Sequence, residues 1–157
     1  MAAIRKAVAG EAAALTELCV RSKAHWGYDT AFMAQCADSL TVSEASIAAG
    51  HVLVAFDAVG RMVGVAGLEP DGESVDLDVL FVDPPAIGGG AGRLLFQASI
   101  KLARFLGARR MTILADPHAA PFYERMGARF LREAPSDAIP GRTLPLYEYD
   151  LTRGNAP

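Results

Sequence analysis

The chain has 157 residues, of which 52% are hydrophobic and 21% are charged, and 15 Lys and Arg against 18 Asp and Glu give a net charge of −3 at pH 7. This balance excludes a disordered chain, and the lack of a basic excess argues against nucleic acid as a partner. No apolar run reaches the roughly 18 residues of a membrane span, and the N-terminus lacks a signal-peptide core. Cys19 and Cys36 fit no metal or disulfide pattern. We therefore expect a reduced, cytoplasmic protein with no metal.

The N-terminal third predicts one short strand and then helices. Leu15, Leu18, Cys19 and Trp26 recur at the spacing of one helical face, and Gly27 breaks that helix. The expected elements are a strand at 3–8 and helices at 11–24 and 30–37, with a third between an N-cap at Ser43 and a stop at Gly50.

The rest of the chain alternates strands with two helices. A long helix ends at Gly107 and is expected to turn Leu95, Ala98, Leu102, Phe105 and Leu106 inward. Strands are expected at 51–56, 61–68, 74–82, 111–115, 128–132 and 144–151, with turns at 58–60 and 70–72. A short helix is expected at 116–127, with Asp116 as its N-cap and Pro117 as its first residue. The order β-α-α-β-β-β-α-β-α-β-β predicts a mixed α/β (α+β, mixed-sheet) domain over 1–153, with an antiparallel start, a central crossover and a flexible tail at 154–157.

A glycine run between a strand and a helix carries the strongest chemical signal. Glycine accepts positive φ and close approach of a ligand, and a helix start offers unpaired N–H groups, so the run at 88–92 suits a phosphate or pyrophosphate. The alternative is a flexible loop with no ligand. Arg93 breaks the dinucleotide fingerprint, and no P-loop lysine follows the glycines. Pro84 and Pro85 donate no ladder hydrogen bond, so the preceding strand end is expected to splay.

This region resembles the GNAT superfamily of N-acetyltransferases, through the segment LFVDPPAIGGGAGRLLFQASIKLARFLGARRMTILADPHAAPFYERMGARFL. Gly90 and Gly92 fall on the G-x-G/A of the family's R/Q-x-x-G-x-G/A motif, and Ile87 stands where Arg or Gln is usual. The resemblance implies acetyl-CoA as cofactor and CoA as product, with a strand backbone that pairs with the pantetheine arm and gives an oxyanion donor. The implied cofactor-binding residues are Leu80, Phe81, Val82, Ile87, Gly88, Gly89, Gly90, Ala91, Gly92, Arg93 and Asp116.

Tyr123 is the implied general acid. It falls on the tyrosine of the family's A-x-x-x-Y-E-x-x-G helix, with Ala119 at the alanine position. By resemblance its hydroxyl protonates the departing CoA thiolate, and a phenol suits this role because it stays protonated at pH 7. The alternative is a packed tyrosine whose hydroxyl bonds to backbone.

Asp76 and Asp78 are the candidate bases. An amine of pKa near 10 is mostly protonated at pH 7 and must lose a proton before it attacks a thioester. Strict strand alternation places both aspartates on one face, opposite Val75, Leu77, Val79 and Phe81. The alternative is the solvated side of a sheet.

Further candidates concern the acceptor, which the sequence leaves open among small amines, amino acids, antibiotics, polyamines and protein N-termini. The candidates for acceptor binding are His25, Trp26, Tyr28, Arg142 and Tyr147. We predict direct attack of the amine in a ternary complex. The alternatives are a non-catalytic acyl-CoA-binding sensor or interaction module, and transfer of another acyl group. The expected partner is a small-molecule or peptide amine, with no nucleic acid and no membrane, and a homodimer is one further expectation, since relatives often pair.

Overall fold

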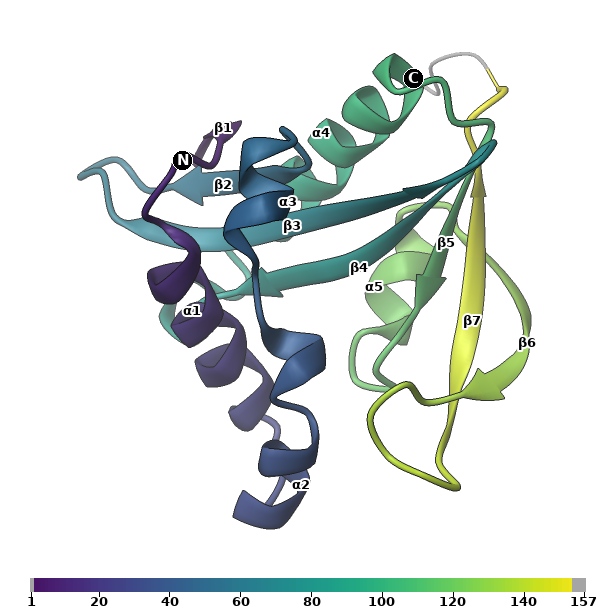
Figure 1. The fold of residues 1–157 in the computed structure, drawn as a ribbon, viewed down its shortest axis with the longest axis horizontal. Helices are drawn as coiled ribbons and strands as arrows, with labels where there is room; N and C mark the ends of the chain where they lie inside the picture. The colour runs from purple at the N-terminus through teal and green to yellow at the C-terminus, as the bar shows by residue number, and fades with distance from the viewer. Residues whose placement is uncertain (1, 154–157) are drawn as a thin grey trace.

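A seven-stranded sheet in the order β1-β2-β3-β4-β5-β7-β6 runs through the centre of the computed structural model, which describes residues 2–153 (Figure 1). The expected tail at 154–157 lies outside the described residues. The strands are β1 (Ala3–Lys6), β2 (Val52–Phe56), β3 (Met62–Asp71), β4 (Ser74–Val82), β5 (Arg110–Leu114), β6 (Arg129–Pro135) and β7 (Thr143–Asp150). All neighbouring pairs are antiparallel except β4 and β5, which confirms the predicted antiparallel start and central crossover.

Helices cover both faces of the sheet (Figure 1). One face carries α1 (Ala12–Ala24), α2 (Thr30–Gln35) and α3 (Glu44–Ala48), while α4 (Ala91–Phe105) and α5 (Ala120–Arg125) lie on the other; two short 3₁₀ turns are η1 (Asp38–Leu40) and η2 (Pro84–Ala86). Each face has its own core, one around Leu15, Leu18 and Cys19 and one around Leu95 and Phe96. No helix within residues 2–153 has the length and apolar character that crossing a membrane requires.

The inward face of α4 differs from the prediction at its C-terminal end. Leu95 and Leu102 are buried, but Phe105 is 82% exposed. Ten residues separate Leu95 from Phe105, which at about 100° per residue puts Phe105 on the flank away from the sheet. Leu106 follows the last helical residue and is also exposed. The helix therefore packs through its first three turns.

The strands β4 and β5 separate soon after they meet. β4 pairs with β3 from Ser74 to Val82, but with β5 only from Ser74 to Asp76. We call this divergence the fork; beyond Asp76 the β4 edge that faces β5 has no strand partner. The end of β4 is thus splayed, as Pro84 and Pro85 predict. The separation from β5 already begins after Asp76, several residues before these prolines.

A β-bulge in β4 corrects the predicted alternation of side chains. Gly67 of β3 pairs with Val79 and Leu68 pairs with Leu77, so Asp78 is an extra residue in the ladder. Such a residue reverses the alternation beyond it. Leu77 accordingly packs in the core beneath α4, whereas Val79 packs in the core beneath α1. The prediction that all four apolar residues share one face is therefore wrong.

One predicted turn and one predicted helix start also change. β3 continues through Pro70 and Asp71, which pair with Val75 and Ser74, so the turn shortens to two residues. The second correction concerns α5, which begins at Ala120 with Ala119 as its N-cap. Asp116 therefore does not cap a helix, and its carboxylate is used for the contacts described below.

Candidate active site

The glycine loop turns sharply into α4. Gly88 and Gly90 have φ of +89° and +91°, values that L side chains rarely adopt, as the sequence predicts. The first helical bond of α4 runs from the N–H of Leu94 to the carbonyl of Gly90 at 3.1 Å. The N–H groups of the preceding turn, Ala91 to Arg93, are therefore left without intrahelical acceptors. A Cβ at Gly88 or Gly90 would meet nothing within 4 Å, so this backbone is open to a ligand.

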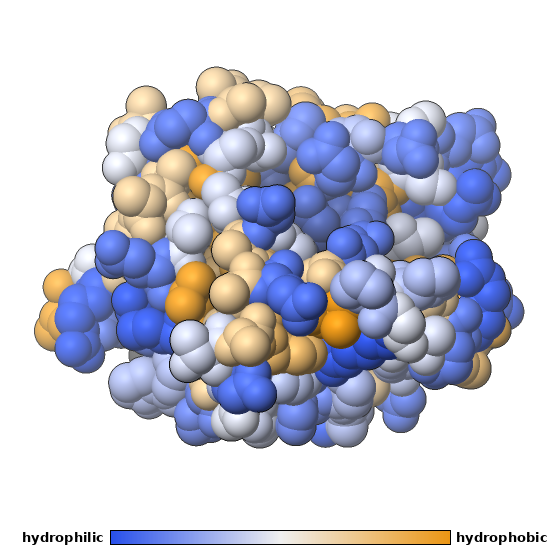
Figure 2. All heavy atoms as spheres, turned by 60° about the horizontal axis from the view of Figure 1, so that its bottom comes forward, coloured by the Kyte–Doolittle hydropathy of each residue, from blue (hydrophilic) through white to orange (hydrophobic). Residues whose placement is uncertain are grey.

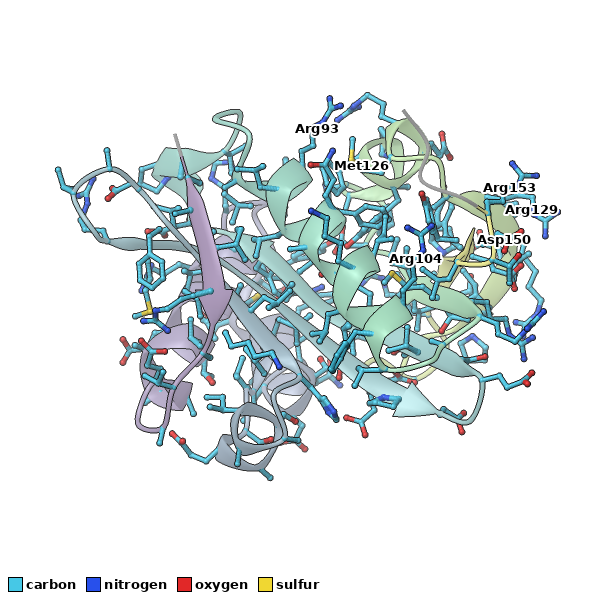
Figure 3. All side chains as sticks on the ribbon, turned by 90° about the horizontal axis from the view of Figure 1, so that it is seen from above. Arg93, Arg104, Met126, Arg129, Asp150 and Arg153 are labelled. Atoms are coloured by element: carbon cyan, nitrogen blue, oxygen red, sulfur yellow. The ribbon has the colours of Figure 1, made fainter. Side chains whose placement is uncertain are left out.

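The surroundings of the loop leave it accessible. It borders a hollow of about 580 Å³ whose lining includes Gly88, Gly89 and Ala91. Ile87 is 45% exposed and has no hydrogen-bonding side chain. Arg93, on the first turn of α4, is exposed and extends outward (Figure 3). Arg104, near the other end of α4, instead donates hydrogen bonds to the carbonyls of Leu151 and Arg153. Backbone N–H groups are thus the main donors at this end, and Arg61 also lines the hollow.

The unpaired edge of β4 leads from this loop into the fork. Leu80, Phe81 and Val82 are only partly buried, and their edge toward β5 has no strand partner. A Cβ on Gly92 would lie 3.4 Å from the ring of Phe122, so α4 and α5 approach closely beside the strand end. The backbone here is arranged to pair with an extended ligand.

Tyr123 lies where α5 meets the fork. It is 5% exposed, and its ring packs against Phe96, Phe122 and Tyr147. Its hydroxyl forms no hydrogen bond with a described residue. Within residues 2–153, every fully buried side-chain N or O atom has a hydrogen-bond partner, so the Tyr123 oxygen must be accessible to solvent. Burial, with the charges of Asp76 and Asp116, raises the pKa of Tyr123, and the phenol therefore holds its proton at neutral pH.

The two candidate bases lie near the closed end of the fork. The Thr112 hydroxyl donates to Asp76 at 2.9 Å across the last paired position of β4 and β5. Burial raises the pKa of Asp76, and nearby charges on Asp137 and Glu69 add to the effect. Asp78, the bulge residue, is more exposed, yet desolvation and the charges of Asp76 and Glu69 raise its pKa to about 7. A carboxylate of this pKa is suited to accept a proton at neutral pH.

A polar cluster joins the α1–α2 segment to the strand ends across the fork. The Tyr28 hydroxyl and Lys23 ammonium donate to Oδ2 of Asp116 at 2.7 and 3.2 Å, and the His118 amide donates to Oδ1 at 2.9 Å. Arg142 donates to the Tyr28 hydroxyl at 3.1 Å. Burial alone would raise the pKa of Asp116, but the His118 amide, the Tyr28 hydroxyl and Lys23 lower it to about 2. Asp116 is therefore ionised at neutral pH, with its two oxygens occupied.

Aromatic rings surround this cluster. Tyr28 stacks on Phe32 at 4.2 Å between centroids, and Trp26 stacks on His118 at 4.7 Å. His25 meets Trp26 edge-on. Trp26 is 44% exposed and belongs to neither core. On the face that Figure 2 turns forward, where α2 projects, hydrophobic residues form small islands among hydrophilic ones. The segment 25–32 thus presents rings beside charged groups.

Of the predicted acceptor residues, the structure brings Tyr28 and Arg142 together and places Tyr147 elsewhere. Tyr147 is 2% exposed and donates a hydrogen bond to Glu124, beneath Phe130. Lys23, Phe32 and His118 also belong to this cluster, and the sequence does not single them out as site residues. Their only signal is proximity in sequence to Tyr28 and Asp116, and the contacts that unite them span about 90 residues of chain.

Neither cysteine is placed to act as a nucleophile. Cys19 and Cys36 are free and buried, and burial raises the pKa of Cys19 to about 12, so this thiol is no nucleophile at neutral pH. Within residues 2–153, no three His, Cys, Asp or Glu side chains are grouped to hold a metal.

A family model described as an acetyltransferase (GNAT) domain matches residues 9–136, which include the glycine loop, the fork and Tyr123. No curated protein matches the sequence.

Solved structures agree with the family match. A GCN5-related N-acetyltransferase from Rhodopseudomonas palustris is 27% identical, with a TM-score of 0.72 and 94% of each chain covered. YncA from Salmonella typhimurium, solved with acetyl-CoA, is 25% identical, with a TM-score of 0.70 over 100% of this chain and 98% of that one. The PaiA N-acetyltransferase from Thermoplasma acidophilum, in complex with CoA, is 16% identical, with a TM-score of 0.76 over 96% and 99% of the two chains, and shows the shared fold alone.

Proposed function

The chain belongs to the GNAT acetyltransferase family, and on this premise we propose that it transfers the acetyl group of acetyl-CoA directly to the amine of an acceptor bound in the same complex. One observation carries the proposal: the unpaired edge of β4 runs between the open glycine loop and Asp76, and Tyr123 packs in the same core as this strand. A single extended molecule that lies along this edge would reach from a phosphate-binding helix start to a proton donor. We assign the catalytic domain to 1–153.

The residues of the loop and fork fit CoA. Backbone N–H groups of the loop and the start of α4, above all those of Ala91 to Arg93, would hold the diphosphate. Ile87, just before the loop, offers no cationic side chain for this role. Leu80, Phe81 and Val82 would pair with the amide-bearing arm, as an added strand does. Asp116 is saturated by its neighbours, so a CoA contact there would be indirect.

Bound acetyl-CoA supplies an electrophilic thioester carbonyl, and the chain supplies proton transfers and positioning. The protonated amine gives up two protons in all as its nitrogen bonds to the acetyl carbon and the bond from that carbon to sulfur breaks. Asp78 accepts the first proton, directly or through water, and a hollow of about 30 Å³ that it shares with Thr41, Ser43 and Ser46 has room for one water. Tyr123 donates a proton to the sulfur, and the second proton from nitrogen restores the phenol.

The raised pKa of Asp78 predicts the pH dependence. Below about pH 7 this carboxyl is protonated and accepts no proton, so kcat at saturating acceptor should fall roughly tenfold per pH unit below that value and level off above it. Asp78→Asn should lower kcat at pH 8 and abolish this acid limb. The measurement is kcat from pH 5.5 to 9, with Asp71→Asn, an exposed aspartate at the end of β3, as the matched control. An acid limb that persists unchanged in Asp78→Asn would show that another group is the base.

The overall activity is tested by release of free thiol from acetyl-CoA in the presence of a panel of amines. The proposal predicts amine-dependent release together with an N-acetylated product detected by mass spectrometry. Binding of CoA without release for any amine would support the sensor reading instead. A parallel series with propionyl-CoA and succinyl-CoA separates acetyl transfer from transfer of a larger acyl group.

A further inference from the structure

The acceptor side of the fork carries two poles of opposite charge. The positive pole consists of Lys23 and Arg142 around Asp116. The negative pole consists of Asp76 and Asp78, to which Glu69 and Asp137 add their charges. This separation stands out in a chain whose net charge is only −3.

The positive pole keeps a surplus of charge and of donors. Two cations, one of them 13% and the other 22% exposed, share the single carboxylate of Asp116, which leaves a net charge of +1. Lys23 uses one of its three N–H donors on Asp116, and Arg142 donates one hydrogen bond to Tyr28 while its nearest approach to Asp116 is 3.9 Å. Asp116 already receives four hydrogen-bond contacts. A second anion would therefore find donors here, and an amine would find no vacant acceptor.

Aromatic rings orient the Lys23 ammonium and the Arg142 guanidinium. The Arg142 guanidinium lies 4.9 Å from the centroid of Phe32, and the Lys23 ammonium lies 5.3 Å from that of Tyr28. Since Tyr28 and Phe32 are stacked, the two cations lie against one pair of rings. This arrangement holds both side chains in place before an acceptor arrives.

The two poles belong to one site. Thr112 of β5 donates to Asp76 at 2.9 Å, and Asp116 follows just after the end of β5, so both poles lie along this strand. The charges of Asp76 and Asp116 also raise the pKa of Tyr123. The connection between β6 and β7 contributes to both poles, since its Arg142 donates to Tyr28 and the charge of its Asp137 acts on Asp76. Next to Asp137, Ala138 and Ile139 pack on the core beneath α1 and α2. An amine at the negative pole and an anion at the positive pole would thus flank the proton donor.

We propose that the acceptor is a small zwitterion, an amino acid or close analogue, whose carboxylate binds Lys23 and Arg142 and whose amine faces Asp76 and Asp78. This inference rests on the proposed acetyl transfer and narrows its acceptor class. A polyamine or aminoglycoside lacks the anion and would place a cation beside Lys23 and Arg142. These amines are the acceptors that the site disfavours.

The first test compares each L-amino acid with its own amide, which keeps the shape and the amine but removes the negative charge. Thiol release is measured for the twenty amino acids, their amides, and spermidine. We expect the preferred amino acid to exceed its amide in kcat/KM by about ten- to a hundredfold, mostly through KM, as loss of a charged hydrogen bond implies. An equal or better rate with the amide, or with spermidine, overturns the inference while the transferase activity stands.

The second test removes the cations one at a time. Arg142→Gln should reduce the preference for amino acid over amide to near unity and leave the KM for acetyl-CoA unchanged. Lys23→Met provides an independent variant, and Arg132→Gln, an exposed arginine on β6, is the matched control. Thermal unfolding confirms that each variant is folded. A preference that survives in both Arg142→Gln and Lys23→Met contradicts the assignment, whereas no thiol release by the wild-type protein with any amine contradicts the proposed function itself.

Discussion

Replacing Tyr123 with phenylalanine is expected to lower kcat by about a hundredfold and to leave the Kd for CoA within about twofold, since a positioned general acid contributes 10²–10⁴-fold. The substitution removes one oxygen from a ring that is otherwise packed on all sides by Phe96, Phe122 and Tyr147. Since the hydroxyl bonds to no described residue, no partner is left unsatisfied and the fold should be preserved. Steady-state kinetics and titration calorimetry with CoA provide the two readouts.

Tyr149→Phe is the matched control for this prediction. Tyr149 lies two residues further along β7 than Tyr147 and also contacts Phe96, with ring centroids 5.6 Å apart. Loss of its hydroxyl should change kcat by less than about twofold, because Tyr149 has no part in the proposed mechanism and its ring contact with Phe96 is kept. Unchanged turnover in Tyr123→Phe would remove Tyr123 from the mechanism and direct attention to water as the proton donor.

The second large effect concerns the glycine loop. The double variant Gly88→Ala/Gly90→Ala should raise the Kd for CoA about a hundredfold, because alanine resists the positive φ at both positions and the N–H groups would no longer converge. Neither new Cβ meets a neighbour within 4 Å, so the effect comes from backbone conformation. Calorimetric titration with CoA measures the change.

A second double variant, Gly10→Ala/Gly107→Ala, serves as the control for backbone strain outside the loop. These glycines have φ of +92° and +85°, are equally free of neighbours, and lie away from the loop. Both double variants should lose comparable thermal stability, and only the first should lose CoA affinity. Equal affinity in the two would show that the loop does not hold the diphosphate.

Local patterns in the sequence predict much of this fold. The residues between β2 and β3 form the expected hairpin, with Asp57 and Arg61 bonded across it. Ser43 caps α3, and Gly88 and Gly90 have positive φ, because turn and cap residues act through their own backbone. Phe105 shows the limit of local reasoning, since hydrophobicity alone does not say which flank of a helix end meets the sheet.

The site was less predictable, because its parts come from distant segments. The bulge at Asp78 depends on how β3 and β4 align, and it changes which side chains share a face. The cluster around Asp116 draws on residues 93 positions before it and 26 after it, and only the folded sheet brings these together. Tyr123 could be anticipated through the resemblance of its helix to the family's motif, and the loop through its run of glycines between a strand and a helix.

The central claim is that main-chain amides between Gly88 and Arg93 hold the diphosphate of CoA. Calorimetric titration of the purified wild-type protein with CoA tests it most directly. The account predicts saturable binding of one CoA per chain, with competition by acetyl-CoA. No heat of binding and no thermal stabilisation at millimolar CoA would contradict it.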